Sequence, residues 1–210
     1  MIDRNIFVIL IISSIFLSCC VTQEDKKNEK IYNLEVKNLK ILIILMPENF
    51  RDEEFKIPKE KLERSGVSVI VAGLQTGEAR GMLGMTATPD TTIDNISIDE
   101  YDAIIVPGGS GSPKYLWDNE KVHQILREGN EKGKIIAGIC LSGAVLAKAG
   151  VLEGKNATVF ATPESLKALE EGGALYKKEP VVVDGNIVTA DGPSSAGRFA
   201  DEILKLLASK

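Results

Sequence analysis

The chain has 210 residues, of which 44% are hydrophobic and 5% aromatic, and its formal net charge is −5. This size suits one globular domain with an appendage. A mildly acidic chain with no block of Lys and Arg, and with few aromatic rings for base stacking, argues against nucleic acid as a partner. Three Cys and one His without a Cys-x-x-Cys pair argue against a metal site.

The N-terminal residues 1–20 are typical of a signal peptide or a lipoprotein signal. Residues 6–17 form a mostly apolar run, which is shorter than the roughly 17–25 residues that span a membrane. Leu17-Ser18-Cys19-Cys20 then resembles a lipoprotein processing box, so we expect a lipid anchor on Cys20 or Cys19 and a membrane-associated or exported protein. An uncleaved signal anchor and a buried N-terminal strand are the alternatives.

Residues 21–37 mix acidic and basic side chains with only scattered apolar ones. Such a stretch buries too little apolar surface to offset the entropy lost on ordering it. The composition therefore predicts a charged tether that holds the following domain away from a membrane. The alternative is a partly helical extension that docks on the domain.

From residue 38 to residue 210, apolar runs alternate with helical patterns. In chain order, the first expected elements are a strand at 39–45, a helix at 52–64, strands at 67–72 and 102–106, and a helix at 120–132 with Asn119 as N-cap. A strand at 134–137, a helix from 144, a strand at 157–160 and a helix opening at Pro163-Glu164 follow. The last elements are a hairpin at 181–189 with its turn at Asp184-Gly185 and a closing helix at 195–207. Strands that alternate with helices imply an α/β fold: a mostly parallel sheet with helices on both faces. Ligands of such sheets bind beyond the carboxyl ends of the strands.

The segment Gly138-Ile139-Cys140-Leu141-Ser142-Gly143 follows an apolar run and precedes a helical one. A sharp turn from strand to helix at a nucleophile is typical of the elbow of α/β hydrolases, here with Cys in the Ser position. The helix N-terminus favours a thiolate, so we expect Cys140 to have a lowered pKa. The alternative is a buried cysteine that packs as a small hydrophobic residue.

A reactive Cys140 needs an acid–base partner and donors for a developing oxyanion. The only histidine, His123, lies within a helix, where a surface or half-buried position away from the strand ends is expected. Glu54 precedes Phe55 and Ile57-Pro58, so its carboxyl group is the candidate that faces inward and stays protonated.

The other acids near the first strand, Glu48, Asp52 and Glu53, are expected to be solvated and to complement the helix dipole. For the oxyanion, the backbone N–H groups of Leu141 and Gly109 are the candidate donors. The run Gly108-Gly109-Ser110-Gly111 lacks the Gly-Lys-Ser/Thr ending of a phosphate loop, and no cofactor is expected.

Five segments follow one another along the chain: Leu42-Ile43-Ile44-Leu45, the Glu-rich segment 47–58, Val106-Pro107-Gly108-Gly109, Ala137-Gly138-Ile139-Cys140 and Thr189-Ala190-Asp191-Gly192-Pro193. In their order and spacing, these segments resemble the DJ-1/PfpI superfamily. The resemblance covers most of residues 39–208. It implies a flavodoxin-like three-layer α/β sandwich that forms homodimers or larger assemblies. It also implies that Glu54 hydrogen-bonds a reactive Cys140, and that Gly109 and Leu141 supply oxyanion-type N–H groups.

The chain departs from this pattern at two positions. Protease-like members carry His directly after the Cys, where this chain has Leu141, and DJ-1-like members carry His about where this chain has Thr162. Peptidase activity is therefore not expected. The resemblance implies a cysteine-dependent hydrolase or lyase that acts on small reactive carbonyls or their adducts, as glyoxalase- and deglycase-like members do. The alternatives are a non-enzymatic redox or stress-response protein that uses the same Cys, and a binding module in which the Cys has no role.

Overall fold

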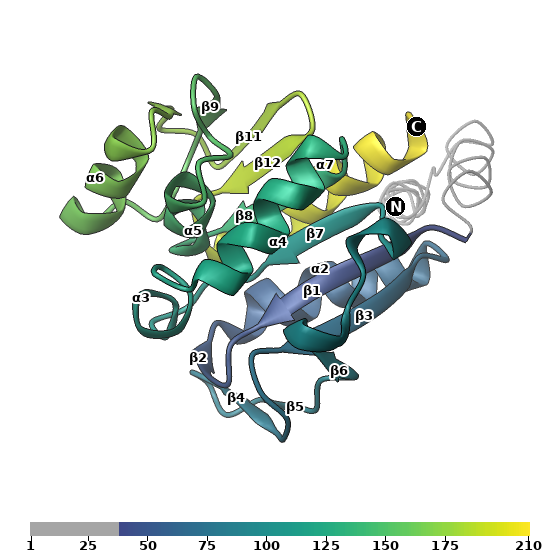
Figure 1. Ribbon diagram of the computed structural model, residues 1–210. Helices are drawn as coiled ribbons and strands as arrows, with labels where there is room; N and C mark the ends of the chain where they lie inside the picture. Colours follow the sequence, from purple (N-terminus) through teal and green to yellow (C-terminus); the bar gives the residue numbers. More distant parts are fainter. Residues whose placement is uncertain (1–37) are drawn as a thin grey trace, which may run out of the picture.

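The computed structural model describes residues 38–210 (Figure 1). The signal expected at 1–20 and the tether expected at 21–37 lie outside the described residues. Within residues 38–210, none of the helices combines the length and the apolar composition needed to cross a bilayer.

A seven-stranded sheet forms the centre of the domain (Figure 1). Its strands are β1 (Lys40–Leu45), β3 (Ser68–Gly73), β6 (Thr91–Thr92), β7 (Ala103–Val106), β8 (Ile135–Ile139), β11 (Val181–Asp184) and β12 (Ile187–Ala190). Their order across the sheet is β11-β12-β8-β7-β1-β3-β6, and every pairing is parallel except the β11–β12 hairpin. The five inner strands have the strand order of flavodoxin, so the α/β fold predicted from the sequence is confirmed.

The central strands are continuous apolar runs because helices cover both faces of the sheet. In β1 every residue after Lys40 is buried, and all of β7 and β8 is buried. The helices are α2 (Asp52–Arg64), α3 (Ser112–Tyr115), α4 (Glu120–Glu131), α5 (Ser142–Lys148), α6 (Pro163–Glu171) and α7 (Ala196–Ala208), with 3₁₀ turns η1 (Ile93–Asn95), η2 (Ile98–Glu100) and η3 (Pro193–Ser195). Helices α2 and α7 pack together on one face, and α4 and α5 cover the other with α6 against α5 (Figure 1).

Local capping explains where two of the expected helices begin. The Asn119 side chain accepts a hydrogen bond from the Val122 N–H group, which confirms the expected N-cap of α4. Thr162 caps α6, because its hydroxyl oxygen accepts from the Ser165 N–H group while the Ser165 hydroxyl oxygen accepts from the Thr162 N–H group. This reciprocal pair is a capping box with serine at its third helical position.

The strand expected at 157–160 is wrong in extent. Strand β9 covers only Asn156–Ala157 and pairs with β10 (Leu175–Tyr176) in a separate two-stranded sheet. The next backbone donors are used elsewhere: the Thr158 N–H group donates to Thr189 Oγ1 at 2.9 Å, and the Phe160 N–H group donates to the Cys140 carbonyl at 3.3 Å. This segment is therefore tied to the end of the main sheet instead of continuing β9.

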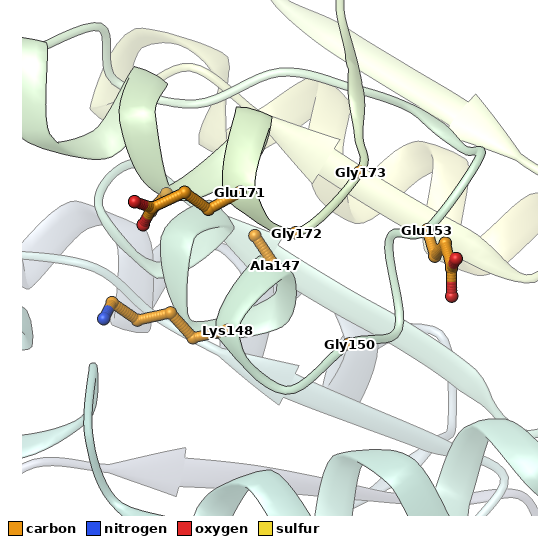
Figure 2. Close-up of a pocket in the computed structure, with 8 residues that line it drawn as sticks. Ala147, Lys148, Gly150, Glu153, Glu171, Gly172 and Gly173 are labelled. Carbon is orange, nitrogen blue, oxygen red and sulfur yellow. The ribbon is translucent and has the colours of Figure 1, made fainter.

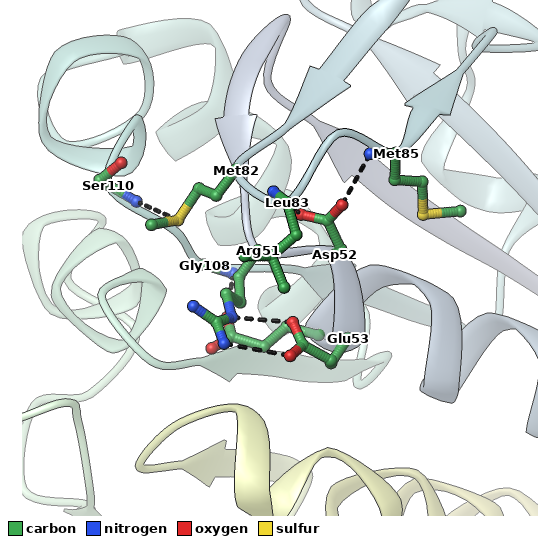
Figure 3. Close-up of polar contacts among 9 residues, drawn as sticks. Arg51, Asp52, Glu53, Met82, Leu83, Met85, Gly108 and Ser110 are labelled. Atoms are coloured by element: carbon green, nitrogen blue, oxygen red, sulfur yellow. Dashed lines mark hydrogen bonds and ion pairs between the residues drawn. The ribbon is translucent and has the colours of Figure 1, made fainter.

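A three-stranded sheet formed by β2 (Glu48–Phe50), β4 (Ala79–Gly81) and β5 (Thr86–Ala87) lies beyond the end of β1. Its hairpin is held by Asp52, which the sequence analysis placed in solvent but which is only 8% exposed. The Asp52 carboxylate accepts from the N–H groups of Leu83 and Met85 at 2.9 and 2.8 Å (Figure 3). The expectation for Asp52 is corrected because its partners lie about thirty residues further along the chain, outside any local pattern.

Candidate active site

The carboxyl ends of two neighbouring strands and the start of one helix meet at a single point. Strand β8 leads into Cys140, and β7 leads into Pro107, Gly108 and Gly109. Glu54 lies in the first turn of α2, which follows the end of β1 by way of β2. The parallel pairing of β7 with both β1 and β8 brings these three segments to the same edge of the sheet.

Cys140 occupies a strained turn between β8 and α5. Its φ angle is 58°, in the left-handed region that residues other than glycine seldom adopt. The Cys140 N–H group donates to the Ala190 carbonyl at 2.8 Å, and two residues later α5 begins at Ser142. The turn therefore has the form of a nucleophile elbow, and it leaves Cys140 only 7% exposed.

The Glu54 carboxyl group is fully buried, and it shares one small space with the Cys140 side chain. Glu54 Oε2 accepts a hydrogen bond from the Gly108 N–H group at 3.0 Å, whereas Glu54 Oε1 is buried without a hydrogen-bond partner. A Cβ atom on Gly108 would lie 2.7 Å from both Cys140 Cβ and Glu54 Oε2. Only glycine at position 108 leaves room for the acid and the thiol to face each other.

Two main-chain donors act on the Cys140 sulfur. The N–H groups of Leu141 and Gly109 both lower the pKa of the thiol by hydrogen bonding. Gly109 has a φ angle of 126°, and a Cβ atom there would lie 2.3 Å from the Asn49 carbonyl oxygen. Glycine is thus required for the turn that presents this N–H group, and the structure brings both donors expected from the sequence to the sulfur.

Burial dominates the electrostatics of the pair. Desolvation raises the pKa of Glu54 to about 7, against the smaller lowering effects of Cys140 and of the Gly108 N–H group. Desolvation, followed by the negative charge of Glu54, raises the pKa of Cys140 to about 12. The pKa of the Cys140 thiol is therefore raised, whereas the sequence predicted a lowered pKa. That prediction considered the helix N-terminus but not the burial of the thiol. The two groups share their protons, so the pair as a whole releases one proton near pH 7 and retains the other.

The remaining candidates lie apart from this pair. His123 in α4 is 6% exposed, more buried than expected, and burial lowers its pKa. Its Nδ1 atom is 3.9 Å from Glu120 Oε2, and none of its described contacts is with Cys140 or Glu54. Thr162 serves as the cap of α6. A thiol–imidazole pair is therefore absent from the part of the chain that the structure describes.

The two other acids near the end of β1, Glu48 in β2 and Glu53 in α2, have different partners. Glu48 is exposed, as expected, and accepts from the Tyr115 hydroxyl at 2.9 Å. Glu53 pairs with Arg51 through two hydrogen bonds of 2.8 and 3.0 Å (Figure 3). The Arg51 N–H group donates to the Gly108 carbonyl at 2.8 Å, which fixes the start of α2 against the glycine turn. Neither this contact nor the Gly108–Glu54 bond was predicted from the sequence, for which a double glycine after a strand was the available signal.

Two cavities are lined by residues other than Cys140 and Glu54. One, of about 410 Å³, lies between α5 and α6 and is lined by Lys148, Glu153 and Glu171 among others (Figure 2). Another, of about 650 Å³, is lined by Phe160, Tyr176 and Pro193 among others, and the Phe160 N–H group bonds the Cys140 carbonyl. No cluster of three or more His, Cys, Asp or Glu suited to a metal ion occurs in residues 38–210.

The buried acid makes a prediction for stability. Between about pH 4.5 and 7 the unfolded chain has released the Glu54 proton while the folded chain keeps it, so the free energy of unfolding falls as the pH rises. A rise in pKa from 4.5 to about 7 corresponds to about 3 kcal/mol. Glu54→Gln keeps an acceptor for the Gly108 N–H group but has no proton to release. We therefore expect its free energy of unfolding not to fall over this pH range. Urea unfolding of both proteins from pH 4.5 to 7.5 measures the difference, and parallel stability curves would contradict a buried, protonated acid.

Known proteins resemble this chain in sequence and in fold. The DJ-1/PfpI family model matches residues 39–206. The chain is 41% identical to an uncharacterised protein of Methanocaldococcus jannaschii over 97% of both chains, and 34% identical to a deglycase of Thermococcus kodakarensis over 79% of this chain and 98% of the relative. The crystal structure of a ThiJ/PfpI domain protein from Brachyspira murdochii superimposes with a TM-score of 0.78 at 34% identity, over 83% of this chain and 99% of that one. The chain belongs to the DJ-1/PfpI family.

Proposed function

We propose that this protein is a cysteine-dependent enzyme that processes small reactive carbonyls or their adducts, in the manner of a deglycase or glyoxalase. One observation carries the proposal: the Cys140 sulfur, the Glu54 carboxyl group and the N–H groups of Leu141 and Gly109 converge in one nearly closed space. Relatives from Thermococcus and Pyrococcus species that the chain covers over 98% of their length are named deglycases, which supports the same class of reaction.

The reactive form is the pair with one proton removed. Its single negative charge can lie on either group, and two N–H groups stabilise it on the Cys140 sulfur whereas one stabilises it on the Glu54 carboxyl group. The side chains of Glu54 and Cys140 hydrogen-bond each other, so a proton on the carboxyl group gives Glu54 a donor role toward the thiolate. Taken singly, the pKa of about 7 for Glu54 and of about 12 for Cys140 place the charge on the carboxyl group, and the reactive form, a thiolate beside a carboxylic acid, is reached when the Cys140 proton passes to Glu54.

The chemistry follows from these positions. The Cys140 thiolate adds to the aldehyde carbon of a 2-oxoaldehyde, and a C–S bond forms while the carbonyl oxygen becomes an oxyanion. The N–H groups of Leu141 and Gly109 stabilise this oxyanion, and Glu54 protonates it. The Glu54 carboxylate then moves the proton of that carbon to the neighbouring carbon through an enediol, which gives a thioester. Water hydrolyses the thioester to a 2-hydroxy acid and restores the thiol, so the net reaction consumes one water and no external oxidant.

A redox-sensing role of the same cysteine is the second candidate. A thiolate with two N–H donors can attack hydrogen peroxide, and with one proton from Glu54 the products are a sulfenic acid and water. The burial of Cys140, at 7% exposed, favours a small reagent such as peroxide. A lipid anchor at Cys19 or Cys20, export to a membrane surface and assembly into homodimers or larger oligomers stay predictions from the sequence.

Turnover of methylglyoxal distinguishes the two candidates. We expect the purified protein to convert methylglyoxal to lactate in the steady state, and Cys140→Ala to reduce kcat to the uncatalysed level because the nucleophile is gone. Lactate is measured by an enzymatic endpoint assay, and protein folding is checked by circular dichroism. Absence of turnover with any 2-oxoaldehyde, together with clean oxidation of Cys140 by peroxide, would reject the enzyme and favour the sensor.

A further inference from the structure

Two fully buried serine side chains lie directly beside the elbow. Ser142 is the first residue of α5 and Ser112 is the first residue of α3, and both are 0% exposed. A buried hydroxyl group requires hydrogen-bond partners. Ser142 Oγ donates to the Pro107 carbonyl oxygen at 2.8 Å, and Ser112 Oγ lies 3.3 Å from Ser142 Oγ.

The direction of these bonds follows from the number of protons. A serine hydroxyl group has one proton and two lone pairs. The proton of Ser142 goes to Pro107, so the Ser112 hydroxyl donates to Ser142 Oγ. The Ser112 N–H group also donates to the Gly109 carbonyl at 3.0 Å. A closed ring of bonds therefore runs from Pro107 through Gly109 to Ser112, across to Ser142, and back to Pro107.

A second contact from the same region reaches the other side of the elbow. The Trp117 indole N–H group donates to the Leu141 carbonyl at 3.0 Å, and the Trp117 main chain is bonded to Ser112. Ser112, at the start of α3, thus connects both segments: it bonds the turn that carries Gly109 directly, and it bonds the segment that carries Leu141 through Trp117. Neither can shift relative to the other without breaking one of these bonds.

We propose that Ser142, supported by Ser112, is a positioning residue of the site: its hydroxyl group fixes the Gly109 N–H group and the Leu141 N–H group at the spacing at which both bond the Cys140 sulfur. The measurement of turnover rests on the proposed function. The measurement of Cys140 ionisation does not, because both N–H groups lower the pKa of Cys140 whether or not the protein is an enzyme.

The test compares Ser142→Thr with Ser142→Val. Both variants add the same bulk, and they differ in the hydroxyl group alone. For each, the rate of Cys140 alkylation by iodoacetamide is measured from pH 5 to 10, and kcat and KM are measured with methylglyoxal. We expect the Val variant to alkylate about tenfold more slowly than the Thr variant at pH 7, with its profile moved to higher pH, and to lose about tenfold in kcat with little change in KM. Ser68→Ala, at the exposed start of β3, serves as the control without effect.

A readout of folding separates positioning from simple stability. If the Thr and Val variants share one pH profile while only the Val variant has a lower Tm, the hydroxyl group is structural and the proposal is overturned. Ser112→Ala, which adds no bulk, covers the case in which the larger side chains prevent folding. Its profile is expected to shift in the same direction by a smaller amount, and an unchanged profile overturns the proposal. A shifted alkylation profile in a protein with no turnover of 2-oxoaldehydes supports the positioning role and rejects the proposed function.

Discussion

Gly108→Ala is expected to reduce kcat for 2-oxoaldehydes by about a hundredfold or more. A Cβ atom at this position would lie 2.7 Å from Cys140 Cβ, 2.7 Å from Glu54 Oε2 and 2.6 Å from the Ile139 carbonyl oxygen. The acid and the thiol are side chains that can move apart, but the carbonyl belongs to β8 and cannot. The added methyl group therefore separates the pair and also strains the end of the sheet, with an expected cost of about 1–3 kcal/mol.

The matched control for this variant is Gly197→Ala. Gly197 lies in α7, and a Cβ atom there meets nothing within 4 Å. This substitution is expected to leave activity unchanged and to stabilise the helix by up to about 1 kcal/mol. Steady-state kinetics and thermal unfolding of both variants provide the comparison. Full activity of Gly108→Ala would show that contact between Glu54 and Cys140 is not needed.

Glu54→Gln is expected to reduce kcat by about 10²- to 10⁴-fold, because the amide can neither protonate the oxyanion nor move the proton between carbons. The same substitution is expected to stabilise the protein near pH 7 relative to the wild type, since the buried acid that begins to ionise there is replaced by a neutral group. A loss of activity that accompanies a gain in stability is characteristic of a functional group retained at a cost to the fold. Equal activity of the two proteins would remove Glu54 from the reaction.

Local pattern was enough to predict the elements that position the site. The apolar run before Cys140 and the small residues after it predicted the elbow, and the apolar neighbours of Glu54 predicted its inward orientation, which the structure shows as complete burial. The double glycine after the strand at 102–106 predicted a main-chain donor at Gly109, and the Cβ distances at Gly108 and Gly109 explain why both positions are glycine.

Features that depend on distant parts of the chain escaped prediction. Asp52 looked like an exposed acid of a first helical turn, but its partners are the N–H groups of a hairpin at Leu83 and Met85. The buried hydroxyl of Ser142 has its acceptor at Pro107, 35 residues earlier. The pKa of Cys140 was misjudged for the same reason, since burial and the charge of Glu54 arise from the tertiary structure.

The shared proton of Cys140 and Glu54 is the central claim, and the pH dependence of Cys140 alkylation measures it most directly. The rate constant with iodoacetamide is followed from pH 5 to 11 in the wild type and in Glu54→Gln, with Cys140→Ala as the blank. A single rise with its midpoint near pH 7 in the wild type, moved by at least one pH unit in Glu54→Gln, is the predicted result. A wild-type thiol that reacts only above pH 9, with the same profile in Glu54→Gln, would contradict the account, because the Cys140 proton would then stay on the sulfur after the pair has lost its first proton.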